Sequence, residues 1–291
     1  MPRTIDDGFR DFLTQLTPST TESAAAKSHR ASIEACLRVN FSTSRFFRSG
    51  SFGNATSISG YSDVDYFAVI PTNNLKSDST TSLTTVRDVL DTRFPRTGVR
   101  INCPAVKVPF GVSAAENTEV VVADDVGKTA TGYQLYDIAD CAGGWKKTSP
   151  DAHDAYVRSI DTKLSSKVKP LIRFVKAWKF FNQVPLASFY LELRVAKYSS
   201  GESSIVYYID LKRFFEHLQT IDLAGLQDPM GVSGIIYGCQ TTSQVTEAKS
   251  KLATAVTRAQ KLYNAQRDGD TKTAFEYLGY LFGGKFPSYY L

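Results

Sequence analysis

Two aspartates, Asp63 and Asp65, stand one residue apart at the start of the apolar run VDYFAVI. If this run is a strand, its period-two alternation sends both carboxylates to one face and Val64 and Tyr66 to the other, with the acids about 7 Å apart along the backbone. Such a pair can hold one or two hard cations such as Mg²⁺ or Mn²⁺, which take oxygen ligands from carboxylates and from substrate phosphates. The pair therefore indicates metal-assisted phosphoryl or nucleotidyl transfer.

A glycine and a serine, Gly50 and Ser51, precede the aspartates by a polar loop. Glycine lets the backbone approach a phosphate closely, while the serine hydroxyl and nearby amides can donate hydrogen bonds to its oxygens. A phosphate-binding turn followed by metal-binding carboxylates is the order that a nucleoside triphosphate needs. The alternative is an ordinary turn and a solvated strand end, because so short a motif also arises by chance.

The first half of the chain has the pattern of an α/β region. Amphipathic stretches predict helices, and short apolar runs bounded by Gly, Pro or Asn predict strands. The predicted helices span residues 6–16, 20–39 and 80–94, and the predicted strands span 44–50, 64–71, 99–104, 106–111 and 119–124.

The second half is predicted to be mostly helical, from about Asp151 onward. Apolar residues recur every three or four positions over 150–183, with Pro170 expected to bend this helix or to mark a restart. Further helices are predicted over 187–199, 206–221 and 246–267. We therefore predict an α+β protein with a core lobe over 1–155, which includes the N-terminal helices, and a helical lobe over 156–291, with the active site in the cleft that they share.

Composition is that of an ordinary globular protein, with 42% hydrophobic and 22% charged residues in 291. The net charge of +5 is mild and the basic residues are scattered, so a long nucleic-acid polymer is not an expected partner. No apolar run reaches the length of a membrane span, and the start MPRTIDDGFRDFL lacks the order of a secretory signal. We expect a cytoplasmic protein that does not bind membranes.

The four cysteines are Cys36, Cys103, Cys141 and Cys239, and they lie far apart with no C-x-x-C pair. This spacing fits neither a zinc ribbon nor a compact disulfide scaffold. We expect all four to be reduced and partly buried.

The stretch GSFGNATSISGYSDVDYFAVI resembles the signature of polymerase β-type nucleotidyltransferases, and most closely that of the bacterial cyclic GMP-AMP synthase-like and DncV-like enzymes, the CD-NTases. The stretches GGWKKTSPDAH and VKPLIRFVKAWKFFNQVPLASFYLELRVA are similar to that family's link into the helical lobe and to its lysine-bearing and serine-bearing helices. The resemblance runs to about Ala196. It implies a polymerase β-type core with a mixed sheet, joined to a mostly helical lobe.

The resemblance also implies a third acid on a later strand, which completes a Mg²⁺ or Mn²⁺ site with Asp63 and Asp65. Glu119 takes this place in TEVVVAD, and alternation sends Glu119 and Val121 to one face of the strand. The competing acids are Asp124, Asp125, Asp137 and Asp140. Asp124 would face away from Glu119 on a regular strand, and the other three lie in segments that we interpret as loops.

By the same resemblance, Lys176 on a helix and Ser188 at a helix start would hold the triphosphate, with Gly50 and Ser51 contributing from the core lobe. A helix N-terminus adds a favourable environment for the anion. The alternative is a solvated lysine and an ordinary helix cap. Tyr66, Tyr133 and Trp145 could stack a base, but strand aromatics belong more often to the core. His153 could be mistaken for a general base, and we interpret it as a contact at a helix start.

The resemblance implies an enzyme that joins ATP or GTP, with pyrimidine nucleotides left open, into a cyclic di- or trinucleotide second messenger and releases pyrophosphate. It further implies antiphage signalling of the CBASS type, with an effector protein that binds the product, and we expect the enzyme itself to be a monomer. Two alternatives stay open. One is another nucleotidyltransferase of this fold that makes linear oligonucleotides, adds tails or modifies antibiotics; the other is an inactive nucleotide-binding scaffold.

Overall fold

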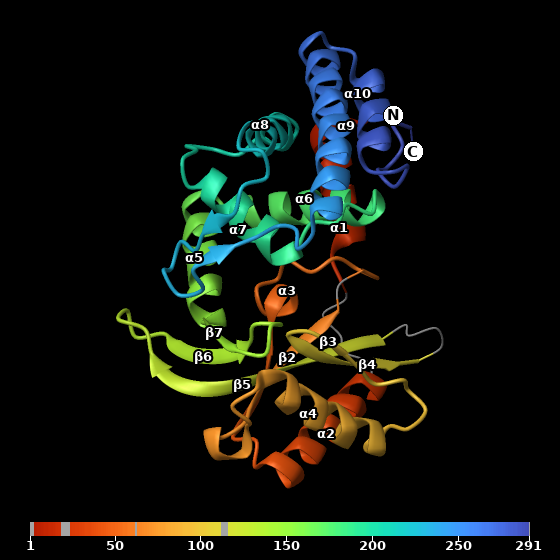
Figure 1. Ribbon diagram of the computed structural model, residues 1–291. Coiled ribbons are helices and arrows are strands. Elements are labelled where there is room, and N and C mark those ends of the chain that lie inside the picture. The colour runs from red at the N-terminus through yellow and green to blue at the C-terminus, as the bar shows by residue number, and fades with distance from the viewer. Residues whose placement is uncertain (1–2, 19–23, 62, 112–115, 291) are drawn as a thin grey trace.

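The computed structural model describes residues 3–18, 24–61, 63–111 and 116–290. Within these residues a seven-stranded mixed sheet forms the lower part of the molecule in Figure 1, and helices form the upper part. The strands of the sheet are β1 (Arg45–Ser49), β2 (Val64–Val69), β3 (Arg100–Asn102), β4 (Ala105–Phe110), β5 (Glu116–Lys128), β6 (Gln134–Ala139) and β7 (Trp145–Thr148).

The strand order is β1-β2-β5-β4-β3, and β6 joins β5 to β7. Strands β2 and β5 run parallel, whereas the other pairs are antiparallel. The long strand β5 is therefore central, since it pairs with β2, β4 and β6. This mixed sheet with a helical second part confirms the predicted α+β class.

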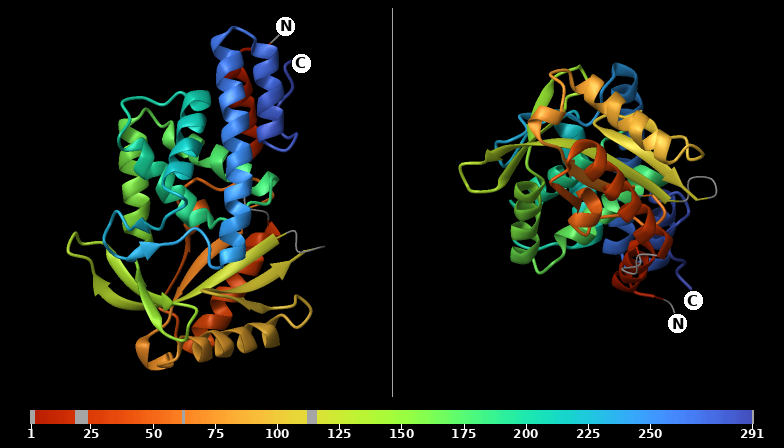
Figure 2. Two further views of the ribbon diagram at one scale, coloured as in Figure 1. Left: turned by 45° about the horizontal axis from the view of Figure 1, so that its top comes forward. Right: turned by 90° about the horizontal axis from the view of Figure 1, so that it is seen from below.

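Helices cover the sheet from both sides. The helices are α1 (Ile5–Leu16), α2 (Ala24–Phe41), α3 (Gly50–Gly53), α4 (Ser79–Arg93), α5 (Pro150–Lys163), α6 (Val168–Phe181), α7 (Ser188–Ser199), α8 (Tyr207–Thr220), α9 (Thr242–Arg267) and α10 (Thr271–Leu281), with a 3-10 turn η1 (Thr72–Asn74) and a small hairpin of β8 (Leu226–Gln227) and β9 (Ile235–Ile236). Helices α2 and α4 lie against the lower face, and Figure 2 shows the remaining helices above the other face.

Alternation along the strands gives the sheet two different faces. Ala68, Val106 and Val120 pack with α2 and α4 in one buried cluster. Phe67 and Val121 lie on the other face, with Val69, Ala105, Ala123, Tyr136 and Ile138. Asp65 and Glu119 have the same parity as this second set, so their side chains point toward the helical part.

The helical part has its own large core, built around α6 and α7. Helix α1 belongs to this core, because Phe9 and Phe12 pack against Phe174 with ring centroids 5.1 and 5.8 Å apart. The N-terminal helices therefore divide: α2 joins the sheet, whereas α1, which the sequence reading grouped with the core lobe, joins the helical lobe. The proposed boundary at residue 155 falls within α5 and stays a prediction.

The predicted long helix over 150–183 is two helices, α5 and α6, because the chain leaves the helical conformation between Lys163 and Val168. Pro170 lies in the first turn of α6, where its missing N–H removes no helical hydrogen bond. Strand β6 replaces a segment that we interpret as a loop, so Asp137 lies on a strand, and Asp125 likewise lies on β5. The cause is pairing with β5, which overrides the Gly- and Thr-rich local sequence.

The expectation that all cysteines are reduced is wrong for one pair, since Cys103 and Cys141 form a disulfide with Cα atoms 5.7 Å apart. Strands β4 and β6 pair with neighbouring stretches of β5, residues 116–121 and 123–128. The turn between β3 and β4 therefore meets the turn after β6, which the separation of 38 residues conceals. Cys36 and Cys239 are free and partly buried, as expected.

None of the helices in the described ranges is long and apolar enough to span a membrane.

Candidate active site

The parallel pairing of β2 with β5 brings the acids together. In this register Asp65 lies directly opposite Glu119, and Asp63 precedes β2 by one residue. The neighbouring residues Tyr66 and Val120 are buried and have the opposite strand parity. Their burial fixes the direction in which the side chains of Asp65 and Glu119 leave the sheet. The structure thus places the three acids that the sequence singled out on one face of the sheet.

Lys107, which the sequence motifs do not single out, lies among these acids. Its Nζ donates to Asp63 Oδ2 at 3.0 Å and lies 3.7 Å from Glu119 Oε1. Across the sheet Lys107 is the direct antiparallel partner of Glu119. Asn102 Nδ2 donates to the same Glu119 oxygen at 2.6 Å. The signal for Lys107 was present in VKVPF, where alternation places one lysine between two buried valines.

The electrostatics of the acids reflect crowding. Burial, and then the charges of Glu119 and Asp63, raise the pKa of Asp65 to about 7, with Lys176 acting in the opposite direction. Burial also raises the pKa of Glu119, against the hydrogen bond from Asn102, and the neighbouring Asp63 raises it further. Carboxyl pKa values shifted upward by burial and by like charges are typical of functional sites.

The donor chemistry of this cluster fits a hard divalent cation. The three side chains offer only carboxylate oxygens, and their mutual repulsion would be relieved by a cation. Among the residues that the structure describes, however, no three or more His, Cys, Asp or Glu side chains are already grouped as metal ligands. Lys107 contacts both Asp63 and Glu119 in this cluster.

Gly50 lies against the acids at the end of β1. Its φ of +61° favours glycine, and a β-carbon at this position would overlap Asp65 Oδ2. Ser51 follows in the short helix α3, and its carbonyl oxygen accepts a hydrogen bond from Thr56 N at 2.8 Å. The structure therefore brings Gly50 to Asp65, and the binding role of both predicted turn residues stays a prediction.

Lys176 does not point to solvent, which excludes the alternative of a solvated helix lysine. Its side chain is 1% exposed and forms an ion pair with Glu192 of α7. Glu192 also accepts hydrogen bonds from Asn54 Nδ2 at 2.6 Å and from Thr56 Oγ1 at 2.7 Å. Although burial opposes it, the charge of Lys176 lowers the pKa of Glu192. This buried cluster joins the segment after Gly50 to the helical lobe.

Lys179, one turn after Lys176, lies beside Ser188 instead. Lys179 Nζ donates to Ser188 Oγ at 2.8 Å, and Ser188 is the first residue of α7, as predicted. Burial, followed by the charge of Lys176, lowers the pKa of Lys179 to about 8, whereas Asp63 acts to raise it. Helical periodicity does not separate the two lysines, because Lys176 and Lys179 both fall within about 40° of Ile172 around the helix axis.

Other residues weighed from the sequence have structural partners. His153 Nε2 lies 3.0 Å from Asp228 Oδ2 in a buried pair, which agrees with a contact at a helix start. Asp124 accepts from Thr72 Oγ1 at 2.9 Å. Tyr66 stacks on Phe46 in the core, with centroids 4.9 Å apart. None of these side chains joins the acid cluster.

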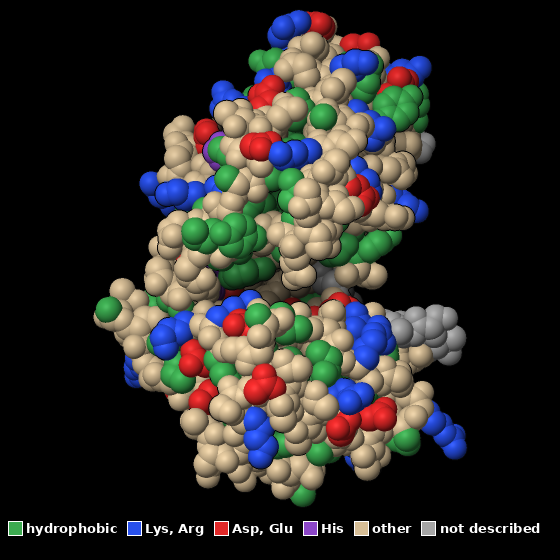
Figure 3. Space-filling model, viewed as in Figure 1, with side chains coloured by type: hydrophobic (Ala, Val, Ile, Leu, Met, Phe, Trp, Pro, Cys, Tyr) green, Lys and Arg blue, Asp and Glu red, His purple; other side chains and the backbone are tan. Residues whose placement is uncertain are grey.

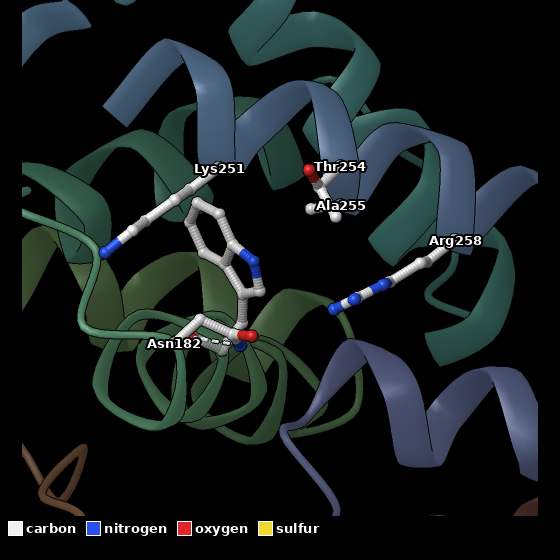
Figure 4. A pocket seen from close by; sticks show the side chains of 6 residues that line it. Asn182, Lys251, Thr254, Ala255 and Arg258 are labelled. Atoms are coloured by element: carbon white, nitrogen blue, oxygen red, sulfur yellow. Dashed lines mark hydrogen bonds between the residues drawn. The ribbon is translucent and has the colours of Figure 1, made fainter. Parts of the chain in front are cut away.

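The space-filling view in Figure 3 shows a hollow between the sheet and the helical lobe, bordered by acidic and basic side chains. A separate cavity of about 180 Å³ lies within the helical lobe, between the end of α6 and α9. Figure 4 shows Lys251 and Arg258 on either side of it. Lys251 donates to Gln183 O at 2.8 Å and Arg258 to Tyr280 O at 2.6 Å, so both cations are engaged by the fold. The acid cluster, on the face of the sheet that points toward the helical lobe, is the candidate active site.

Comparison with known families and structures agrees with this geometry. The sequence matches the family model described as the Second Messenger Oligonucleotide or Dinucleotide Synthetase domain over residues 3–160. A search of curated proteins found no match.

Several solved structures share the fold over nearly the whole chain. The structure of Escherichia coli MS115-1 CdnC with ATP matches with a TM-score of 0.72 at 19% identity, covering 97% of this chain and 98% of that one. Vibrio cholerae DncV cyclic AMP-GMP synthase, in complex with the linear intermediate pppA(3′,5′)pG, matches with a TM-score of 0.77 at 11% identity, covering 99% and 98%. Bradyrhizobium diazoefficiens CdnG with GTP matches with a TM-score of 0.70 at 11% identity, covering 96% and 95%.

Proposed function

Since this chain belongs to the Second Messenger Oligonucleotide or Dinucleotide Synthetase family, the CD-NTases, we propose that it condenses ATP, GTP or both into a cyclic di- or trinucleotide at the cluster of Asp63, Asp65 and Glu119. The family makes the chain a nucleotidyltransferase that produces cyclic oligonucleotides. The observation that supports the site is the register that sets Asp65 opposite Glu119, on the face of the sheet that points toward the helical lobe.

In each transfer, a ribose hydroxyl oxygen forms a bond to the α-phosphorus of a triphosphate. The bond from that phosphorus to the bridging oxygen breaks, pyrophosphate leaves, and the hydroxyl proton passes to a base or to water. The last transfer, within the linear product, closes the ring; it is the second for a dinucleotide and the third for a trinucleotide. DncV has been solved with a linear intermediate, which supports this order of events here.

We propose that Asp63, Asp65 and Glu119 hold Mg²⁺ or Mn²⁺. When bound, such an ion neutralises charge on the transferring phosphoryl group. The chain's own contribution is orientation, because the sheet fixes the acids while Gly50 leaves space for Asp65 beside the turn. The attacking hydroxyl and the α-phosphorus must meet in line, and a preorganised cleft supplies that geometry.

The triphosphate is assigned to the opposite wall of the cleft. Lys179 supplies a cation, and Ser188 a hydroxyl at the N-terminus of α7. Because the amine of Lys176 is already paired with Glu192, its part is to hold this wall in place. Phe189, the next residue of α7, is 43% exposed and offers a ring on which a base can stack.

The biological setting that we propose is antiphage signalling in the cytoplasm, in which an effector protein binds the cyclic product. The family description as a second-messenger synthetase supports this setting. The alternatives of a linear product or an inactive scaffold make different predictions for one experiment.

That experiment is product analysis. The purified chain is incubated with the four ribonucleoside triphosphates and Mg²⁺ or Mn²⁺, treated with phosphatase, and the surviving compounds are identified by mass; a parallel reaction contains excess chelator. We expect a phosphatase-resistant cyclic oligonucleotide that is missing from the chelator control. A linear product would support the first alternative, and no product the second.

A further inference from the structure

Lys107 is positioned by the sheet and not by a mobile loop. Val106 and Val108 are fully buried on the opposite face of β4, and they fix the direction in which the Lys107 side chain leaves the strand. Register pairs Lys107 directly with Glu119. The side chain is only 14% exposed, yet its ammonium group reaches the carboxylates of two different strand segments. The fold therefore builds one positive charge into the acid cluster.

An ammonium group at this place and a divalent ion on the same carboxylates exclude each other. Lys107 Nζ lies 3.0 Å from Asp63 Oδ2 and 3.7 Å from Glu119 Oε1. A magnesium ion shared by these carboxylates would have bonds of about 2.1 Å and so would occupy the same small region. The two cations would repel each other strongly at such a separation, because a partly buried site screens charge poorly.

The lysine side chain can give way without any change in the sheet. Its four-carbon stem is flexible and carries a compact charge, so the ammonium group can leave while the backbone of β4 stays in register. A triphosphate in the cleft would offer the displaced ammonium group a new anionic partner. Glu119 would meanwhile stay oriented by the hydrogen bond from Asn102, which does not depend on Lys107.

We propose that Lys107 is an internal cation of the active site, which neutralises Asp63 and Glu119 in the metal-free enzyme and is displaced when a divalent ion binds. This inference rests on the metal site proposed above. It follows that Lys107 weakens metal binding to the free protein, since each binding event must first break its contacts with the two acids.

The plain alternative is a salt bridge that serves stability alone. The sheet supplies a matched case in Lys147 on β7, which lies 3.7 Å from Asp137 on β6. Here too a lysine faces a carboxylate across antiparallel strands, but the lysine is 57% exposed and contacts none of the three predicted metal ligands. Lys147→Met is therefore the control for the loss of a lysine from this sheet.

The test measures Mn²⁺ binding to the full chain without nucleotide, by titration calorimetry and by the paramagnetic resonance signal of the free ion. The variants are Lys107→Met, Lys107→Arg, Lys147→Met and Asp63→Asn, each checked for folding by circular dichroism. We expect Lys107→Met to bind Mn²⁺ roughly tenfold more tightly or better, equivalent to about 1.4 kcal/mol. Lys107→Arg, which keeps the charge, and Lys147→Met should stay within about twofold of the wild type.

The outcomes separate this inference from the proposed function. If Asp63→Asn weakens Mn²⁺ binding but Lys107→Met binds no more tightly than the wild type, the inference is wrong and the metal site stands. If Asp63→Asn binds Mn²⁺ as the wild type does, the metal site is wrong and the inference falls with it. Should Lys107→Met fail to fold, Lys107→Gln takes its place under the same expectation.

Discussion

Two lysine–carboxylate clusters of similar composition lie on either side of the cleft, and they differ in how completely their charges are satisfied. The buried carboxylate of Glu192 forms an ion pair with Lys176 and accepts hydrogen bonds from Asn54 and Thr56. The other cluster contains the three carboxylates of Asp63, Asp65 and Glu119. Among the described residues, its hydrogen bonds and ion pairs come from one ammonium group, that of Lys107, and one amide, that of Asn102.

The difference appears in the acids themselves. The pKa of Glu192 is lowered, because the Lys176 charge and three donated bonds outweigh burial. The pKa values of Asp65 and Glu119 are raised, because burial and mutual repulsion prevail. We infer that the saturated cluster stabilises the junction, and we propose that the cluster with excess negative charge binds a cation. On this proposal, the same residue types serve structure in one place and chemistry in the other.

The largest expected effect comes from breaking the saturated cluster. Glu192→Ala leaves the ammonium group of Lys176 buried without a counter-charge, and we expect it to lower the free energy of unfolding by about 3–5 kcal/mol. Chemical denaturation measures this loss. Glu216→Ala is the control, because it removes a glutamate paired with Lys212 on the surface of α8 and should cost about 1 kcal/mol or less. Similar losses for the two variants would show that the Glu192 cluster is not saturated.

A smaller effect is expected on the nucleotide side of the cleft. Lys179→Ala removes a cation next to Ser188, and we expect it to weaken binding of a non-hydrolysable ATP analogue by about 1.5–3 kcal/mol while the protein stays folded. Lys197→Ala, which removes an exposed lysine from α7, is the control in the same calorimetric titration. Unchanged affinity in Lys179→Ala would remove Lys179 from the proposed triphosphate site.

The smallest effect, counted per pH unit, is a pH dependence of the metal-free protein. The pKa of Asp65 is about 7 when folded against an ordinary value of 3.8, so between these values the folded state keeps a proton that the unfolded state has released. The free energy of unfolding should therefore fall as the pH rises from about 4 to about 7, by at most about 1.4 kcal/mol per pH unit. Asp65→Asn should lose this dependence and gain stability relative to the wild type as the pH rises. Denaturation curves in chelator at several pH values measure it, and parallel pH profiles would contradict the prediction.

Sequence alone was sufficient for the parts of the fold that follow from local pattern. Alternation in VDYFAVI and TEVVVAD predicted the faces of Asp65 and Glu119, and the two strands present those faces side by side. The roles of these acids and of Ser188 stay predictions. Long-range pairing was out of reach: neither the disulfide of Cys103 with Cys141 nor the strand that contains Asp137 follows from local composition, because both depend on how β4 and β6 share β5.

The choice between Lys176 and Lys179 shows the same limit at the scale of one helix turn. Both lysines lie on α6 and both precede Ser188 by a plausible distance in sequence. Which one faces the cleft depends on the partner that α7 offers to the other, and that partner is Glu192, four residues beyond Ser188. Periodicity does not distinguish the two lysines, and the carboxylate that neutralises Lys176 became visible only with the packing of α6 on α7.

The central claim is that the under-neutralised acids perform nucleotidyl transfer, and pyrophosphate release tests it most directly. Wild type and Asp65→Asn are compared at equal protein concentration with ATP, GTP and Mg²⁺. Thermal unfolding curves first establish that both proteins are folded at the assay temperature. Loss of one carboxylate from the metal site should reduce the rate of pyrophosphate release by more than roughly a hundredfold, since metal stabilisation of the transition state is worth several kcal/mol. Retention of more than about a tenth of the wild-type rate by Asp65→Asn would contradict the claim.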